Sequence, residues 1–322
     1  MALVRWARDR ALGWQDPLAV DDLAGQVLVL DGVTAADDER LAWVRRAPCV
    51  TVALTPAGAA PARTADVSLG PHELDALDGI VAAVEARPRA SRVLIDVLRA
   101  TEGLEVPAAL VVESLAYSAL LAAPEAAAWL ADRPAPRTRS FTGPPVRVER
   151  DGSELRIRLA RPENRNALSA AMRDALFEAL LLAEVDPSVE AVVLAGDGPA
   201  FCSGGDLDEF GTATDVALAH EIRARRSVGA VLARLAPRVT VRVHGACVGA
   251  GTELPAFAGR VVAAPDATFR LPEVGMGLIP GAGGTVSLPR RIGRQATARL
   301  ALTGATIDAE AALDLGLVDE VR

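Results

Sequence analysis

The chain has 322 residues, of which 51% are hydrophobic and 24% charged, and its formal net charge is −8. The hydrophobic fraction excludes a disordered protein, and the length suits two domains or one large one. Neither half of the chain is basic, which argues against a nucleic-acid-binding face. All 34 basic residues are Arg. The absence of Lys excludes a Schiff-base lysine and a Walker-type phosphate loop, since both require an amine.

The distribution of Cys and His argues against a metal site. The cysteines form no CxxC pair, and the three histidines have no metal-ligand spacing. We therefore expect reduced thiols in a cytoplasmic protein and no bound metal.

No membrane-targeting segment is expected. Residues Met1–Trp14 carry charges where a signal peptide needs an apolar core. The most apolar long stretch, residues 106–131, is interrupted by Glu113, Pro124 and Glu125. We therefore predict neither a signal peptide nor a membrane span.

The first 142 residues are predicted to be an α/β and helical region. Val27–Leu30 and Val50–Leu54 have the composition of strands, with a helix expected near Asp37–Arg46 between them. From Pro71 onward the pattern is helical. Residues 133–145 contain four prolines and indicate a linker. We therefore expect one region over 1–142 and a second over 143–322.

The second region alternates strands with helices. Apolar residues alternate with charges on both sides of Asp151-Gly152, which predicts a β-hairpin. Ser169 is a candidate N-cap for an amphipathic helix, and Val216–Leu235 is predicted to be another helix. Further strands are expected at 191–195, 239–243, 261–264 and 268–271. This order predicts an α/β domain.

Three glycine-rich segments lie at or near the ends of predicted strands in this region. They read PAFCSGGDL (199–207), VHGACVGAGTEL (243–254) and FRLPEVGMGLIPGAGGT (269–285). Glycine lets backbone amides approach a ligand closely, so two such loops could direct two N–H donors at one oxygen. Glu253 and Glu273 lie in the second and third segments. Taken singly, each feature is more typical of an ordinary turn, a helix cap or a solvated charge than of a catalytic site.

Together with LARPENRNALS (159–169), these ordered segments resemble the crotonase (enoyl-CoA hydratase/isomerase) superfamily. The resemblance covers about residues 146–322 and implies a core of stacked β-β-α turns. It also implies that the backbone amides of Gly205 and Ala250 form an oxyanion hole for the thioester oxygen of an acyl-CoA. Ala250 stands where family members often have Gly, and it keeps the amide.

The resemblance further implies an enzyme that adds water reversibly to a 2-enoyl-CoA. Hydratases of the family use two glutamates, which correspond here to Glu253 and Glu273. No metal or other cofactor is implied, because CoA is part of the substrate and the thioester itself acidifies the α-carbon. Asp206, Leu207 and Asp208 are expected to line the substrate channel; a solvated helix start explains the two aspartates equally well. A homotrimer or a dimer of trimers is implied.

Several alternatives stay open at this point. One is an enoyl-CoA isomerase, which often keeps only one of the two glutamates. Another is a non-catalytic acyl-CoA-binding subunit, which needs only the amide pair. A specialised enzyme for an unusual acyl-CoA is a third. Arg290, Arg291 and Arg294 could meet CoA phosphates, although an exposed arginine cluster is the simpler expectation.

The helical segment before the linker has a second resemblance. The chain stops at Arg322, where crotonases continue with helices that cover the acyl site. Residues 94–130 resemble those helices, although they precede the core. This suggests a circularly permuted arrangement, with an unrelated N-terminal helical domain as the alternative. If permuted, these helices should pack on the core near the acyl site.

Overall fold

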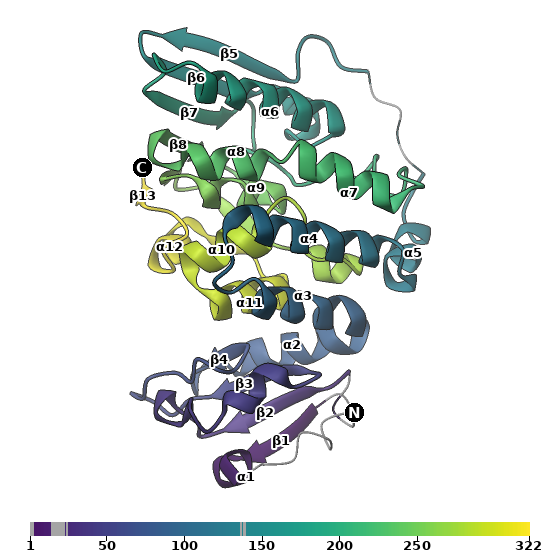
Figure 1. The fold of residues 1–322 in the computed structure, drawn as a ribbon, viewed down its shortest axis with the longest axis vertical. Coiled ribbons are helices and arrows are strands. Elements are labelled where there is room, and N and C mark those ends of the chain that lie inside the picture. The colour runs from purple at the N-terminus through teal and green to yellow at the C-terminus, as the bar shows by residue number, and fades with distance from the viewer. Residues whose placement is uncertain (1–2, 14–22, 24, 136, 138–139) are drawn as a thin grey trace.

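The computed structural model describes residues 3–13, 23, 25–135, 137 and 140–322. Predictions made for Met1, Ala2 and Trp14, and for linker residues 136, 138 and 139, lie outside the described residues. Sheets and helices follow one another in layers along the longest axis (Figure 1), with the N-terminal sheet at one end and the hairpin β5–β6 at the other. The mixed architecture with parallel strands confirms the expected α/β class.

The second region is built on a six-stranded sheet. β5 (Val146–Asp151) and β6 (Glu154–Leu159) pair antiparallel, with Val146 opposite Leu159, which confirms the hairpin. β6 continues the sheet in parallel with the remaining strands in the order β13-β10-β8-β7-β6. These strands are β7 (Ala191–Gly196), β8 (Val239–Val243), β10 (Arg260–Ala263) and β13 (Glu320–Val321).

Helix α6 (Ala170–Val185) connects β6 to β7 and forms as predicted. The Ser169 side chain accepts a hydrogen bond from the amide of Met172 at 3.2 Å, so Ser169 is the N-cap. One face of the helix is buried against the sheet, and it consists of Met172, Leu176, Ala179, Leu180 and Ala183.

A second, three-stranded sheet lies beside the first, in the order β12-β11-β9. Its strands are β9 (Ala246–Val248), β11 (Thr268–Arg270) and β12 (Ile307–Asp308). Short helices follow these strands, namely α9 (Ala250–Glu253), η7 (Glu273–Met276), α10 (Gly284–Ile292), α11 (Arg294–Thr303) and α12 (Ala309–Asp314). The ends of β9 and β11 thus lead directly into the segments that carry Glu253 and Glu273.

The single helix expected over Val216–Leu235 is wrong, because the structure contains two. α7 (Val216–Arg225) ends before Ser227, whose side chain caps α8 (Val228–Leu235) by accepting the Ala230 amide at 3.2 Å. No residue of α7 is fully buried, whereas α8 buries an apolar face. The two halves therefore lack a common apolar stripe that would hold them in one line.

The N-terminal sheet has four parallel strands in the order β1-β2-β3-β4. The predicted strands are confirmed as β2 (Val27–Asp31) and β3 (Val50–Leu54), while β1 (Leu3–Ala7), followed by α1 (Arg8–Gly13), and β4 (Val67–Leu69) were not predicted. The helix expected near Asp37–Arg46 is wrong: the segment forms two 3₁₀ turns, η2 (Ala35–Asp37) and η3 (Ala42–Arg46). Asp37 accepts the Thr34 amide at 3.0 Å, a local bond that competes with a continuous helix.

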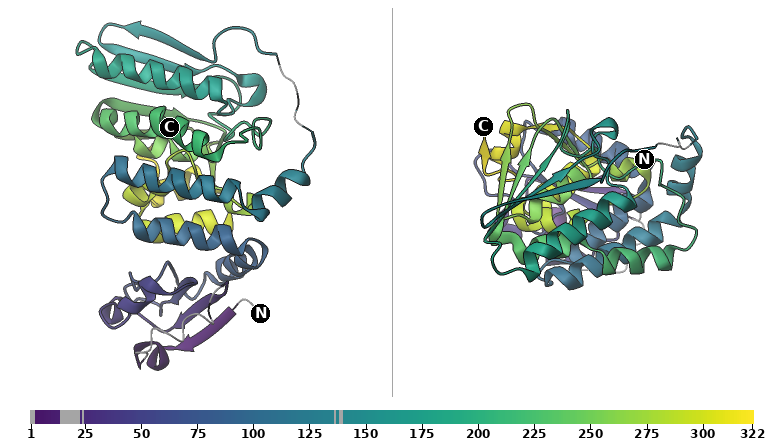
Figure 2. Two further views of the ribbon diagram at one scale, coloured as in Figure 1. Left: turned by 45° about the vertical axis from the view of Figure 1, so that its right-hand side comes forward. Right: turned by 90° about the horizontal axis from the view of Figure 1, so that it is seen from above.

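Four helices follow this sheet in the chain (Figure 1). They are α2 (Leu74–Ala86), α3 (Pro88–Ala100), α4 (Val106–Leu121) and α5 (Pro124–Ala131). α3 and α4 pack on α10, and α2 and α3 pack on α11, as the blue and yellow helices of Figure 2 show. Among the described residues no single helix has the length and apolar composition of a membrane span; α4 and α5 meet these criteria only as a pair bent by 61°.

The two regions share one hydrophobic core. A continuous cluster of buried side chains runs from Val29 and Val52 of the N-terminal sheet through Leu94 of α3 to Val286 of α10. The fully buried Asp66 adds a polar link, because it accepts hydrogen bonds from Arg99 at 2.6 Å and from Arg294 at 3.1 Å. The N-terminal region therefore packs on the second region as part of one body.

Candidate active site

A cavity of about 400 Å³ lies where α4 faces the glycine-rich loops. Gly205, Ala250, Glu253 and Glu273 all line it. The structure therefore brings together the four residues that the sequence marked for oxyanion binding and proton transfer.

The amides of Gly205 and Ala250 belong to two loops that lie side by side. The amide of Val248 donates to the Cys202 carbonyl at 3.0 Å, which ties the loop after β9 to the loop after β7. Among the described residues, neither the Gly205 amide nor the Ala250 amide donates to another group. Two backbone donors on the wall of one cavity are thus available to a ligand.

Glu253 is anchored by one of its two carboxylate oxygens. Oε2 accepts the amides of Ala282 at 2.7 Å and Gly284 at 2.8 Å. Oε1 takes part in no hydrogen bond with a described residue. Burial raises the pKa of Glu253 to about 7, against the effect of the two amides, which favour the ionised form.

Glu273 has a buried oxygen without a partner. Its Oε2 makes no hydrogen bond to any described residue. Burial raises the pKa of Glu273 well above its usual range, and the neighbouring Glu253 raises it further. The loop before α9 fits closely around this side chain: Gly249 has φ +49°, and a Cβ there would lie 2.4 Å from Glu273 Oε1. Glycine at position 249 therefore satisfies both the turn and the approach of the carboxyl group.

A third carboxylate, Glu113 of α4, lines the same cavity and was not predicted as a site residue. Its Oε1 accepts the amide of Gly283 at 2.8 Å, and its Oε2 accepts the amide and the hydroxyl of Thr285 at 2.9 and 2.7 Å. Burial raises the pKa of Glu113 to about 8, with a further contribution from Glu253. The one feature of the sequence that could have indicated a role for Glu113 is that it is the sole charged residue of the apolar helix α4.

Glu113 and Glu253 together cap helix α10. The four successive amides of residues 282–285 donate alternately to Glu253 and Glu113. These are amides that a helix leaves without internal acceptors, and the positive end of the helix dipole favours carboxylates there. The cap fixes both carboxyl groups at the cavity wall. In the described part of the chain, no cluster of His, Cys, Asp and Glu is arranged to hold a metal ion.

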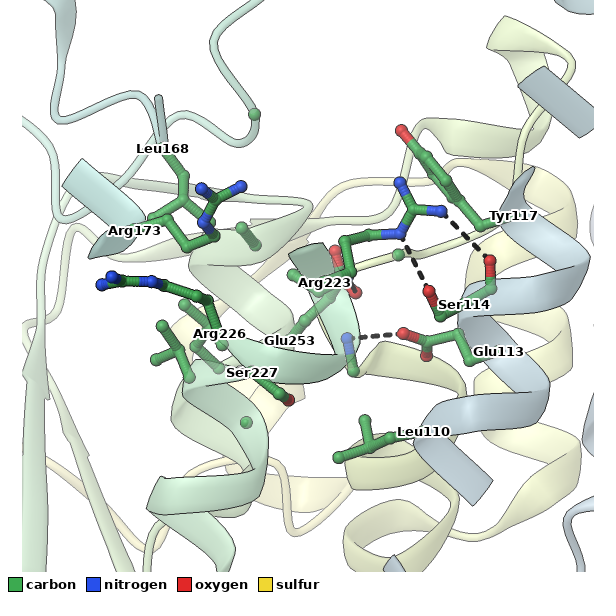
Figure 3. A pocket seen from close by; sticks show the side chains of 18 of the residues that line it. Leu110, Glu113, Ser114, Tyr117, Leu168, Arg173, Arg223, Arg226, Ser227 and Glu253 are labelled. Carbon is green, nitrogen blue, oxygen red and sulfur yellow. Dashed lines mark hydrogen bonds between the residues drawn. The ribbon is translucent and has the colours of Figure 1, made fainter. Parts of the chain in front are cut away.

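A basic and hydroxyl-bearing group lies beside Glu113 in the cavity wall, where Arg223 reaches α4 (Figure 3). Arg223 of α7 donates from Nε to Ser114 Oγ at 3.0 Å, and its Nη2 donates to the Ser114 carbonyl and to Ser118 Oγ. The guanidinium carbon lies 4.9 Å from the ring centroid of Tyr117. These residues were not predicted either, because their proximity depends on the packing of α4 on α7.

Asp206, Leu207 and Asp208 do not line this cavity. Asp206 accepts the amide of Asp208 at 3.1 Å and so shapes its own loop. Leu207 is 40% exposed, and Asp208 accepts the amide of Arg137 at 3.2 Å. A substrate-binding role for these three residues stays a prediction.

The three arginines of α10 and α11 do not form the exposed cluster that was expected. Arg294 is buried against Asp66, and Arg291 donates to the carbonyls of Leu317 and Ala258 at 2.7 and 2.9 Å. The exposed Arg290 donates to the Val286 carbonyl at 2.7 Å. Their hydrogen bonds tie the second region together and join it to the first.

Comparison with known proteins identifies the family of this chain. The sequence profile of the enoyl-CoA hydratase/isomerase family matches residues 149–322. The chain is 35% identical over 174 residues to the 2,3-dehydroadipyl-CoA hydratase of Escherichia coli, covering 54% of this chain and 68% of that protein. It is 41% identical to a probable enoyl-CoA hydratase of Rhodobacter capsulatus, covering 51% and 63%. The chain thus spans about two thirds of the length of these curated relatives.

Solved structures extend the likeness to three dimensions. An enoyl-CoA hydratase of Mycobacterium smegmatis is 38% identical with a TM-score of 0.52, covering 56% of this chain and 70% of that one. An enoyl-CoA hydratase of Thermoplasma volcanium is 34% identical with a TM-score of 0.51, covering 56% and 73%. The chain therefore belongs to the enoyl-CoA hydratase/isomerase family of the crotonase superfamily, and its function is enoyl-CoA hydratase-like.

Proposed function

We propose that the protein adds water reversibly across the 2,3 double bond of a 2-enoyl-CoA in the cavity between α4 and the glycine-rich loops. The observation that carries this proposal is the combination of two available amides, at Gly205 and Ala250, with two carboxyl groups that each keep an oxygen free of partners among the described residues. A binding subunit would need the amides alone.

The two amides act on the thioester oxygen. When water adds to C3, the electrons of the double bond move toward the thioester, and its oxygen gains negative charge. Amide donors held at this position before the reaction begins stabilise that charge, and each contributes roughly 2.7–4 kcal/mol in comparable sites. Ala250 serves as well as Gly because only its backbone amide is required.

The two glutamates divide the proton transfers. Glu253, whose Oε2 accepts two amides, is the better anion, so its free Oε1 removes a proton from water as the new C3–O bond forms. Glu273, whose pKa is raised by burial and by the neighbouring Glu253, delivers a proton to C2. Proton transfers of this kind typically contribute about 10²–10⁴-fold each. Exchange with solvent then returns both carboxyl groups to their starting states.

The substrate brings its own activating group, since the thioester acidifies the α-carbon, and the proposed reaction requires no further cofactor. Family resemblance supports a homotrimer or a dimer of trimers as the assembly. One relative is named a 2,3-dehydroadipyl-CoA hydratase, so six-carbon substrates are a suitable starting point for assays.

We also propose that the chain is circularly permuted relative to its family. The chain covers about 70% of the solved neighbours, and residues 94–130 resemble the helices that follow the core in other members. These helices precede the core here and pack on it, with Glu113 and Tyr117 of α4 in the cavity wall.

A screen of acyl-CoA thioesters by mass spectrometry tests the proposed function. A hydratase increases the mass of a 2-enoyl-CoA by one water. An isomerase converts a 3-enoyl-CoA to its 2-enoyl isomer without a mass change, and a binding subunit retains acyl-CoA without converting it. Either of the last two results would replace the hydratase proposal.

A further inference from the structure

Arg223 is a cation in the cavity wall that has no acidic partner among the described residues. It forms no ion pair there, whereas two other arginines of the wall do: Arg173 pairs with Asp174 at 2.8 Å, and Arg226 pairs with Glu178 at 2.8 Å. Its Nε and Nη2 donate to Ser114 and Ser118, while Nη1 has no partner in the described part of the chain. An arginine presents five N–H donors, so two remain for a ligand.

The guanidinium group is held in place rather than flexible. It lies on the Tyr117 ring and is fixed to α4 by its bonds to Ser114, whose hydroxyl also contacts His220 Nδ1 at 2.9 Å. The N–H groups of Nη1 can therefore donate charge-assisted hydrogen bonds to an anion such as a carboxylate.

None of the three glutamate carboxyl groups described above forms an ion pair with Arg223. Burial raises the pKa values of Glu113, Glu253 and Glu273, which favours their neutral forms. Burial also lowers the pKa of Arg223 by desolvating its charge, and the nearby Glu113 offsets only part of this effect. A poorly solvated cation without an anion gains most when a ligand supplies one.

The position of Arg223 indicates which part of the substrate it meets. Leu168, which pairs with Gly205, lies on one side of the cavity with Arg173 and Arg226, and α4 lies on the other (Figure 3). Arg223 projects between the two sides and contacts α4. With the thioester at Gly205 and Ala250, an acyl chain that extends toward α4 leads to Arg223.

We infer that Arg223 binds a carboxylate at the distal end of the acyl chain, so the preferred substrates are CoA monothioesters of dicarboxylic acids. This inference rests on the proposed acyl-CoA site. It differs from recognition of CoA phosphates, which would favour charged and neutral acyl groups equally.

Binding measurements with saturated thioesters test this inference without relying on turnover. Isothermal titration calorimetry should give the dissociation constants of adipoyl-CoA and hexanoyl-CoA, which share chain length and CoA and differ in the terminal group. We expect the wild type to prefer adipoyl-CoA by about 10- to 100-fold, the range for a hydrogen bond to a charged group. Equal affinities in the wild type would overturn the inference.

Matched variants assign the preference to the residue. Arg223→Met should abolish the preference for adipoyl-CoA, and Arg223→Lys should keep part of it because the charge remains. Arg226→Met, at an arginine already paired with Glu178, should preserve the ratio of the two affinities. If Arg223→Met weakens both ligands equally, Arg223 contacts CoA and the inference is wrong. Failure of the hydratase proposal would appear separately, as absence of turnover of 2-enoyl-CoA substrates.

Discussion

Glu113 and Thr285 lie 172 residues apart in the chain, yet the Glu113 carboxylate accepts both the amide and the hydroxyl of Thr285, at 2.9 and 2.7 Å. This pair joins the helix α4 of the first region to the start of α10 in the second. Because the adjacent amides of α10 hold Glu253, we regard Glu113 as a positioning residue for the site.

Glu113→Gln should lower both stability and turnover. An amide replaces one oxygen that accepts from an N–H group, so at least one buried donor loses its partner, at a cost of about 1–3 kcal/mol. We expect a lower melting temperature and a decrease in kcat of about 10-fold with little change in KM, because Glu253 shifts while the substrate contacts remain. Glu105→Gln, at an exposed glutamate just before the same helix, is the control. Turnover equal to that of the control would show that Glu113 does not position the site.

Gly249→Ala should disturb Glu273 by a direct clash and by strain in the loop. The added methyl group would lie 2.4 Å from Glu273 Oε1, at a residue whose φ of +49° already disfavours a side chain. We expect a loss of kcat of at least about 10-fold. Gly103→Ala is the matched control, since Gly103 also has a positive φ, of +82°, and a Cβ there meets nothing within 4 Å. Similar kinetics for the two variants would show that the fit of Gly249 against Glu273 does not matter for turnover.

The pH dependence of kcat/KM should reflect the raised pKa values. Glu253 must be ionised to accept a proton from water, so activity should fall as the pH decreases through about 7 rather than through the usual range of a glutamate near 4.5. Glu273 must be protonated, so activity should fall again at higher pH, above its own raised pKa. Steady-state kinetics between about pH 5 and pH 10 measure both limbs. A rate that is constant from about pH 5 to pH 8 would contradict this assignment.

Removal of the first region should abolish activity. A truncated protein starting at Pro144 lacks Glu113 and uncovers the faces of α10 and α11 on which α2, α3 and α4 pack. We expect it to be insoluble or inactive, as proteins with large exposed apolar patches generally are. A soluble and fully active fragment would mean that residues 1–142 form an independent module, and the proposed permutation would then be wrong.

The sequence predicted the parts of this protein that depend on local patterns. The hairpin around Gly152, the helix capped by Ser169 and the loops that carry Gly205 and Ala250 are encoded by turn residues, periodicity and motif spacing. The structure also places Glu253 and Glu273 in one cavity, as the resemblance to the crotonase superfamily implied.

What the sequence did not reveal depends on long-range packing. Glu113 looked like an interruption in an apolar helix, because nothing local shows that its partners lie at Gly283 and Thr285. The position of Arg223 in the cavity wall depends on the break between α7 and α8 and on the packing of α7 on α4. The sequence pattern indicated neither. The prediction of a helix near Asp37 was wrong for the opposite reason: a local hydrogen bond from the Thr34 amide to Asp37 competes with a continuous helix.

The most direct test of the central claim is the initial rate of crotonyl-CoA hydration, followed as loss of the enoyl-thioester absorbance, in the wild type, Glu253→Gln and Glu273→Gln. Both substitutions keep the size of the side chain and remove its carboxyl group. The two-glutamate mechanism predicts measurable hydration by the wild type and a decrease of at least about 10²-fold in each variant, with CoA binding largely retained. Near-normal hydration by both variants would contradict it.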